Sequence, residues 1–239
     1  MKKNMPSKFF LTALIGLGII NSTAIAQSLA TYEFSYGGAN NPTGLVTSTA
    51  PNVTASNTTW NGLTGTIGFG GSFDSAFVST NALSTSLTTS QYLEFQVTAD
   101  VGTLDLGSFS FDLGGSRTTG STDYTVNAAV RTDVDSYGSN VTLFPGSITT
   151  ASSTFNSTTP SYDTFTADLS SNDYDGLTDI TFRLYVWRTS GSSSTIFLRA
   201  DSLNVSSTVV PEPAAAGLLL GGLILFACVS RRPSRKNRG

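Results

Sequence analysis

Apolar residues alternate with polar ones along several short segments, and this period of two constrains the fold more than any other feature. In the segment 179–187, one face of an extended chain would carry Ile180, Phe182, Leu184 and Val186. The opposite face would carry Arg183, Tyr185 and Trp187. Because successive side chains of a strand point to opposite faces, such alternation predicts a β-strand that is buried on one side.

Six more segments are predicted as strands: 31–36, 66–69, 91–97, 103–113, 124–130 and 195–205. The turns between them are rich in Gly, Ser, Asn and Asp, as hairpins require. In 103–113 the apolar parity switches across Gly107–Ser108, which predicts a bulge or a bend. No stretch between residues 27 and 208 has a convincing helical period. We therefore expect an all-β domain over 27–208, an antiparallel jelly-roll-like β-sandwich whose first and last strands are neighbours.

The residue types that many enzymes and metal sites depend on are scarce. The chain has no histidine, and its one cysteine, Cys228, lies in the hydrophobic C-terminal segment. A histidine base, a Cys/His zinc site and an intrachain disulfide are therefore excluded. No cofactor is predicted. Residues 27–208 carry 15 acidic residues against 5 arginines, a net charge of −10, and a surface this acidic repels nucleic acid.

The N-terminus has the features of an export signal. Lys2, Lys3 and Lys8 precede the apolar run Phe9–Ile20. Ala24-Ile25-Ala26 fits the small-x-small cleavage rule. We predict a signal peptide over 1–26 that is cleaved between Ala26 and Gln27, which implies Sec export and signal peptidase as partners.

The C-terminal segment has the composition of a single membrane span. Residues 214–230 contain no charged side chain, and at about 1.5 Å per residue such a helix nearly matches a bilayer core. Arg231 and Arg232 follow directly and would hold the C-terminus in the cytoplasm. We predict one transmembrane helix over 214–230 with a basic cytoplasmic tail.

Three features of the segment 209–239 occur together: Pro211-Glu212-Pro213, the apolar span 214–230 and the basic pair Arg231-Arg232. This combination resembles the PEP-CTERM sorting signal of Gram-negative bacteria. The resemblance implies that an exosortase removes the tail. It also implies that the protein is anchored transiently in the inner membrane and then reaches the cell surface or the extracellular matrix. The alternative is a plain single-pass anchor.

Three kinds of chemistry are open to the β domain. Arg183 beside Tyr185 and Trp187 could bind a saccharide ring; the alternative is that the aromatic residues form a second hydrophobic layer. Glu94 with an aspartate could act as a glycosidase pair; the alternative is a set of solvated surface acids. The pairs Asp133/Asp135 and Asp173/Asp175 could bind calcium or only stabilise turns, so the metal question stays open.

Two functions follow as hypotheses. The favoured one is a non-enzymatic structural or adhesive protein of the cell surface, matrix or biofilm that is processed by an exosortase and associates with exopolysaccharide. The alternative is a carbohydrate-binding module or a weak polysaccharide hydrolase. The absence of histidine and the scarcity of glutamate favour the first.

Overall fold

The computed structural model describes residues 26–34, 44–70, 73–79, 83–117, 124–155, 161–189 and 196–208. The predicted signal-peptide residues 1–25 and the predicted sorting signal 209–239 lie outside these ranges. Residues Ile25–Val210 form one compact unit. No helix within the described ranges is long and apolar enough to cross a membrane.

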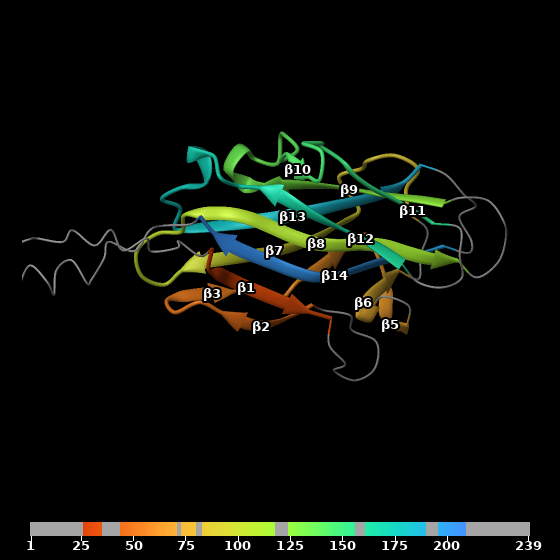
Figure 1. The fold of residues 1–239 in the computed structure, drawn as a ribbon, viewed down its shortest axis with the longest axis horizontal. Coiled ribbons are helices and arrows are strands. Elements are labelled where there is room, and N and C mark those ends of the chain that lie inside the picture. Colours follow the sequence, from red (N-terminus) through yellow and green to blue (C-terminus); the bar gives the residue numbers. More distant parts are fainter. Residues whose placement is uncertain are drawn as a thin grey trace, which may run out of the picture. The chain divides into compact units, whose positions relative to one another are not determined.

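The described residues form two antiparallel sheets that stack as a β-sandwich (Figure 1). Sheet A contains β1 (Ser28–Glu33), β2 (Leu45–Thr49), β5 (Gly65–Gly70), β6 (Phe73–Ser79), β8 (Leu106–Arg117), β10 (Leu143–Phe144), β12 (Ser161–Asp168) and β14 (Ile196–Ser207). Sheet B contains β3 (Val53–Ala55), β4 (Thr59–Asn61), β7 (Tyr92–Ala99), β9 (Tyr124–Thr132), β11 (Ala151–Phe155) and β13 (Asp179–Arg188). The all-β prediction and the prediction of a sandwich are confirmed.

From β7 to β14 the chain crosses between the two sheets at every connection between consecutive strands. Sheet A has the order β10-β12-β8-β14-β1-β2, and sheet B has the order β11-β9-β13-β7-β3. The first strand, β1, pairs with the last, β14, as the sequence predicts. The amide of Ser207 donates to the carbonyl of Gln27 at 2.8 Å, so both ends of the domain lie at the same end of the sandwich.

The core lies between the sheets and is built from the residues that alternation assigns to the inner faces. Phe95 of β7, Phe182 of β13 and Phe109 of β8 pack against one another with ring centroids 5.0 to 5.4 Å apart. Phe109 and Phe182 are completely buried and Phe95 is 2 % exposed. Burial of this apolar surface is the main force that holds the two sheets together.

The predicted irregularity at Gly107–Ser108 is a β-bulge. Ser207 pairs with Leu106 while Ser206 pairs with Ser108, so Gly107 is an extra residue on β8. A Cβ atom at Gly107 would lie 2.5 Å from the carbonyl oxygen of Ser207. Only glycine fits so close to the neighbouring backbone.

Seven strands were not predicted: β2, β3, β4, β6, β10, β11 and β12. Most are short or lie along sheet edges, and β2 and β11 consist mainly of Ser and Thr. In β2 no side chain is fully buried, and in β12 only Phe165 and Ala167 are. A strand that buries few of its side chains needs little apolar alternation, so its sequence resembles a loop.

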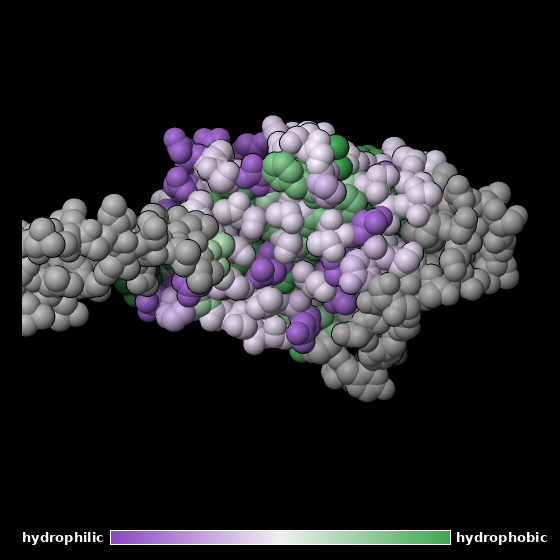
Figure 2. Space-filling view, in the orientation of Figure 1, coloured by the Kyte–Doolittle hydropathy of each residue, from purple (hydrophilic) through white to green (hydrophobic). Residues whose placement is uncertain are grey.

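Two short 3-10 turns interrupt the strands at one end of the sandwich. The first, η1 (Asp133–Asp135), follows β9, and the second, η2 (Asn172–Tyr174), precedes β13. Figure 2, in the orientation of Figure 1, shows hydrophilic residues gathered where η2 lies. The loops that carry these turns form part of the candidate site.

Candidate functional site

The outer face of sheet B brings together polar and aromatic side chains from three adjacent strands. In the strand register, Arg183 of β13 lies opposite Glu94 of β7 on one side and opposite Arg131 of β9 on the other. Tyr185 lies opposite Tyr92. These residues point away from the core because their neighbours in sequence, such as Phe182 and Leu184, point into it.

Arg183 is the centre of this arrangement. Its Nε donates a hydrogen bond to Oε2 of Glu94 at 2.7 Å, which is also an ion pair. Its guanidinium carbon lies 3.7 Å from the ring centroid of Tyr137 and 4.6 Å from that of Tyr92. The guanidinium therefore has cation–π contacts with two tyrosines. The side chains of Arg183 and Glu94 remain 26 % and 30 % exposed. We call Tyr92, Glu94, Arg131, Tyr137 and Arg183 the aromatic–arginine face.

Electrostatics keep two members of this face, Arg183 and Tyr137, in fixed charge states. Burial alone lowers the pKa of Arg183, but hydrogen bonds to Tyr185 and Glu94 and the charges nearby outweigh it and raise the pKa above its ordinary value. Burial raises the pKa of Tyr137, and the positive charge of Arg183 offsets part of that rise. At neutral pH the face therefore presents a permanent cation, Arg183, beside the neutral phenol of Tyr137.

Tyr137 reaches Arg183 from a strained backbone. Ser136 and Tyr137 have φ values of 59° and 60°, in the left-handed region that costs a residue with a side chain roughly 1–2 kcal/mol. Three contacts hold Tyr137 there: its amide donates to the carbonyl of Thr132 at 2.9 Å, its carbonyl accepts from Nη1 of Arg131 at 3.0 Å, and its ring lies on Arg183. Placing the Tyr137 ring over Arg183 therefore costs conformational free energy.

Arg131 links the loop after η1 to the sheet. Its Nε donates to Oδ1 of Asn140 at 2.7 Å, and its guanidinium lies 5.3 Å from the ring centroid of Tyr185. Asn140 in turn donates from Nδ2 to the carbonyl of Thr149 at 3.2 Å. The loop 136–140 is therefore held by Arg131 of β9 on one side and by the backbone of Thr149 on the other.

The predicted glycan-binding residues are on the expected face, but two of them are covered. Tyr185 is 1 % exposed and Trp187 is 8 % exposed. Tyr185 lies beneath Arg131 and against Tyr92, whose ring centroid is 5.2 Å away. The structure thus places both rings in a second buried layer outside the sheet. Of the three predicted residues, Arg183 alone is substantially accessible, and Tyr92 and Tyr137 supply the aromatic surface instead.

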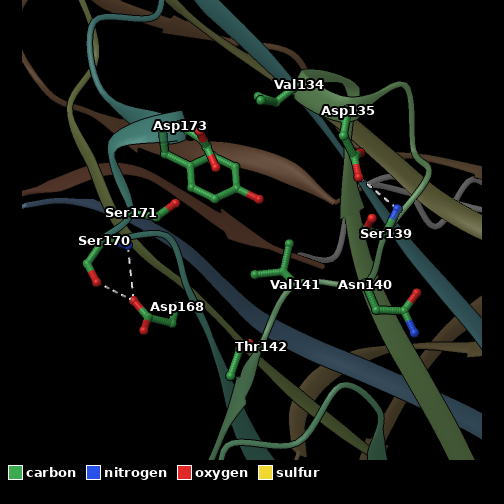
Figure 3. Close-up of a pocket in the computed structure, with 11 residues that line it drawn as sticks. Val134, Asp135, Ser139, Asn140, Val141, Thr142, Asp168, Ser170, Ser171 and Asp173 are labelled. Carbon is green, nitrogen blue, oxygen red and sulfur yellow. Dashed lines mark hydrogen bonds between the residues drawn. The ribbon is translucent and has the colours of Figure 1, made fainter.

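A cleft of about 530 Å³ opens on the other side of the same loop. One wall comes from the segment after β9 and the other from the segment between β12 and β13, with Val141 between them (Figure 3). We call it the loop cleft; its lining is Val134, Asp135, Ser139, Asn140, Val141, Thr142, Asp168, Ser170, Ser171, Asp173 and Tyr174.

In one of the two aspartate pairs considered as calcium ligands, Asp133/Asp135, both side chains accept hydrogen bonds from backbone amides. Asp133 Oδ1 accepts from the amide of Thr181 at 2.9 Å. Asp135 accepts from the amides of Gly138 and Ser139 at 3.1 and 2.7 Å. Within the described ranges, no group of three or more Asp, Glu, His or Cys is arranged to hold a metal ion. These contacts fit the turn-stabilising alternative.

Sequence reasoning missed Tyr92, Arg131 and Tyr137. Tyr92 was predictable in part, because it occupies the outward parity of the predicted strand 91–97. Arg131 directly follows the predicted strand 124–130 and continues its outward parity. Tyr137 lies in a loop, and its position over Arg183 depends on two left-handed residues that no sequence period signals. The sorting-motif residues Pro211, Glu212, Pro213, Arg231 and Arg232 lie outside the described residues. Ala26 and Gln27, which flank the predicted cleavage site, are both exposed just before β1.

No protein-family model matches the sequence, and no curated protein matches it. Among solved structures, a CBM4 module is 13 % identical over 59 % of this chain and 77 % of its own, with a TM-score of 0.33. The N-terminal cellulose-binding domain of β-1,4-glucanase C from Cellulomonas fimi is 18 % identical over 64 % of this chain and 90 % of its own, with a TM-score of 0.32. The family 11 carbohydrate-binding module of Clostridium thermocellum is 12 % identical over 77 % of this chain and 99 % of its own, with a TM-score of 0.31. These TM-scores are too low to transfer a ligand or an activity to this chain.

Proposed function

We propose that this chain is an exported polysaccharide-binding protein of the cell surface or extracellular matrix, with an adhesive and non-enzymatic role. The observation that carries the proposal is the aromatic–arginine face. Two partly exposed tyrosine rings flank a charged guanidinium on the outer face of a sheet, with a carboxylate beside it. Saccharide rings combine an apolar face of C–H groups with hydroxyls at the edge. Aromatic rings complement the first, and charged donors and acceptors complement the second.

The rigidity of the face supports a binding role. Arg183 is held by Glu94 and by two rings, and Tyr137 is held by Thr132 and Arg131. Side chains that are ordered before binding lose less conformational entropy when a ligand arrives. The strain at Tyr137 has a reason if the ring is needed for contact with a ligand.

A non-enzymatic role agrees with the contact that Glu94 makes. This residue was the one named candidate for a glycosidase carboxylate, and it forms an ion pair with Arg183 at 2.7 Å. In that position it orients the guanidinium of Arg183. A weak hydrolase activity would require a second carboxylate at a defined separation from the first.

The route to the surface is proposed from the sequence. A signal peptide would be removed before Gln27, and the segment 209–239 would serve as a PEP-CTERM signal for an exosortase. In the folded domain, the amide of Thr208 donates to the carbonyl of Asp105 at 2.9 Å. Pro211 follows three residues later in the sequence.

Binding is tested on the fragment 27–208, which corresponds to the compact unit. The fragment is screened on a glycan array, and hits are measured by calorimetry. Tyr92→Ala and Tyr137→Ala should each weaken binding at least about ten-fold, because a central aromatic contact contributes more than a rim contact. The matched control is Tyr162→Ala, a half-buried tyrosine on β12 of sheet A.

Two results would overturn the proposal. One is a wild-type fragment that binds no glycan on the array. The other is a hit whose affinity Tyr92→Ala and Tyr137→Ala leave unchanged, which would place the ligand elsewhere. Export is tested separately by N-terminal sequencing of the protein recovered from its host, where Gln27 is expected as the first residue.

A further inference from the structure

The loop cleft has the size and lining of a small-ligand site. Its volume of about 530 Å³ falls within the range of about 300–1,000 Å³ typical of ligand pockets. Val134, Val141 and Tyr174 give it apolar surface, and Ser139, Ser171 and Thr142 add hydroxyl groups. The lining therefore combines the two kinds of surface that a sugar ring complements.

Two aspartates on one wall retain hydrogen-bonding capacity. Asp168 uses Oδ1 to accept from the amide and the hydroxyl of Ser170, at 3.0 and 2.6 Å. Its Oδ2 has no such partner among the described residues. The side chain of Asp173 is exposed beside the cleft, and Figure 3 shows both residues on the wall opposite Asp135 and Asn140. Carboxylate oxygens of this kind accept hydrogen bonds from sugar hydroxyls.

The cleft and the aromatic–arginine face share one loop. Ser139 and Asn140 line the cleft, while Tyr137, two residues earlier than Ser139, covers Arg183 on the face. Arg131 joins the two directly, because it donates to Asn140 and to the carbonyl of Tyr137. A glycan chain that binds on the face could therefore continue past this loop into the cleft.

The charge of the cleft differs from that of the face. Asp135, Asp168 and Asp173 surround the cleft, whereas Arg131 and Arg183 lie on the face. A ligand carboxylate in the cleft would be repelled by the like charges of these aspartates, which costs affinity. Neutral sugar hydroxyls at the same place can instead donate hydrogen bonds to these aspartate oxygens.

We propose that the loop cleft is a second subsite of the glycan-binding surface and that it selects neutral sugar units over uronic acid units. This inference rests on the proposed function and adds the class of ligand to it. The face provides the main contact through Tyr92 and Tyr137. The cleft binds an adjoining sugar through Asp168 and Asp173 and excludes one that carries a carboxylate.

The test uses the fragment 27–208 and an array of neutral oligosaccharides with uronic acid oligosaccharides of equal length. Wild type should bind neutral oligosaccharides and bind the uronic acid series at least about ten-fold more weakly at low salt. The double variant Asp168→Asn/Asp173→Asn should reduce that preference about ten-fold. The control, Glu33→Gln/Asp163→Asn, removes two exposed charges from β1 and β12 outside the cleft and should leave the preference nearly unchanged.

The outcomes separate this inference from the proposed function. No glycan binding by wild type would overturn the proposed function. Binding that Tyr92→Ala abolishes, with a preference that Asp168→Asn/Asp173→Asn does not alter, would overturn the subsite and leave the face intact. An equal effect of both double variants would assign the preference to net charge and would also overturn the subsite.

Discussion

Two substitutions at Tyr137 should separate the contribution of its strained backbone to stability from the contribution of its side chain. Tyr137→Ala removes the ring but keeps a Cβ atom at φ 60°. Tyr137→Gly removes the ring and the steric conflict together. Both variants lose the contact between the ring and the guanidinium 3.7 Å away, which contributes about 0.5–2 kcal/mol to stability.

The difference between the two variants isolates the strain. A left-handed residue with a Cβ atom costs roughly 1–2 kcal/mol, and glycine gives back about 0.5–1 kcal/mol because it loses more chain entropy on folding. The glycine variant should therefore be about 0.5–1 kcal/mol more stable than the alanine variant. With an m-value of about 2 kcal/mol/M in urea, its unfolding midpoint should lie about 0.3–0.5 M higher.

The assay is equilibrium urea unfolding of the fragment 27–208, followed by tryptophan fluorescence and by circular dichroism. Thr154→Gly and Thr154→Ala serve as controls, because Thr154 is an exposed residue in the strand β11. There the order should reverse, with alanine the more stable. If Tyr137→Gly and Tyr137→Ala unfold at the same urea concentration, Tyr137 is not strained, and the link drawn from strain to function fails.

Three more predictions follow from the fold and the sequence. Phe182→Ala, at a fully buried ring, should destabilise the fragment by about 3–5 kcal/mol, which thermal unfolding would show as a lower Tm; a change below about 1 kcal/mol would contradict the described core. Slight desolvation raises the pKa of Asp135, but hydrogen bonds from Ser139 and Gly138 outweigh it and lower the pKa below its ordinary value. Its contribution to stability is therefore present above about pH 4 and lost as the pH falls below that value; Asp135→Asn should flatten the acid limb of the stability curve, and an unaltered limb would refute this. Glu212→Ala should leave the tail uncut and the protein in the membrane fraction; mass spectrometry showing the same mature C-terminus as wild type would refute exosortase recognition of that carboxylate.

The sequence predicts the buried strands of this fold well and the edge strands poorly. The inner faces of β7 and β13 follow from alternation alone, because a buried face requires apolar residues at every second position. The bulge at Gly107 was predictable as well, since an extra residue shifts the parity of everything after it. Strands such as β11, with the sequence Ala-Ser-Ser-Thr-Phe, bury too little to leave such a pattern.

Within the candidate site, only the residues that lie on strands were predictable from the sequence. Parity places Arg183 and Tyr185 on the outer face, but it cannot show that Arg131 covers Tyr185 from the neighbouring strand. That contact depends on the register of β9 against β13, which only the assembled sheet defines. Tyr137 depends on loop geometry, and a loop conformation is determined by specific hydrogen bonds rather than by a repeating pattern.

The pairing of the last strand has a mechanical consequence for an adhesive protein. β14 is flanked along its length by β8 and, over its final residues, by β1. The chain leaves the domain directly after it. A pull along β14 at its C-terminal end would load the hydrogen bonds of both ladders at once. Resistance to force depends on the rate of unfolding, and ladders loaded in parallel must break together, whereas a strand peeled from its end loses them singly. The domain would therefore withstand tension along β14 better than tension that peels this strand from one end.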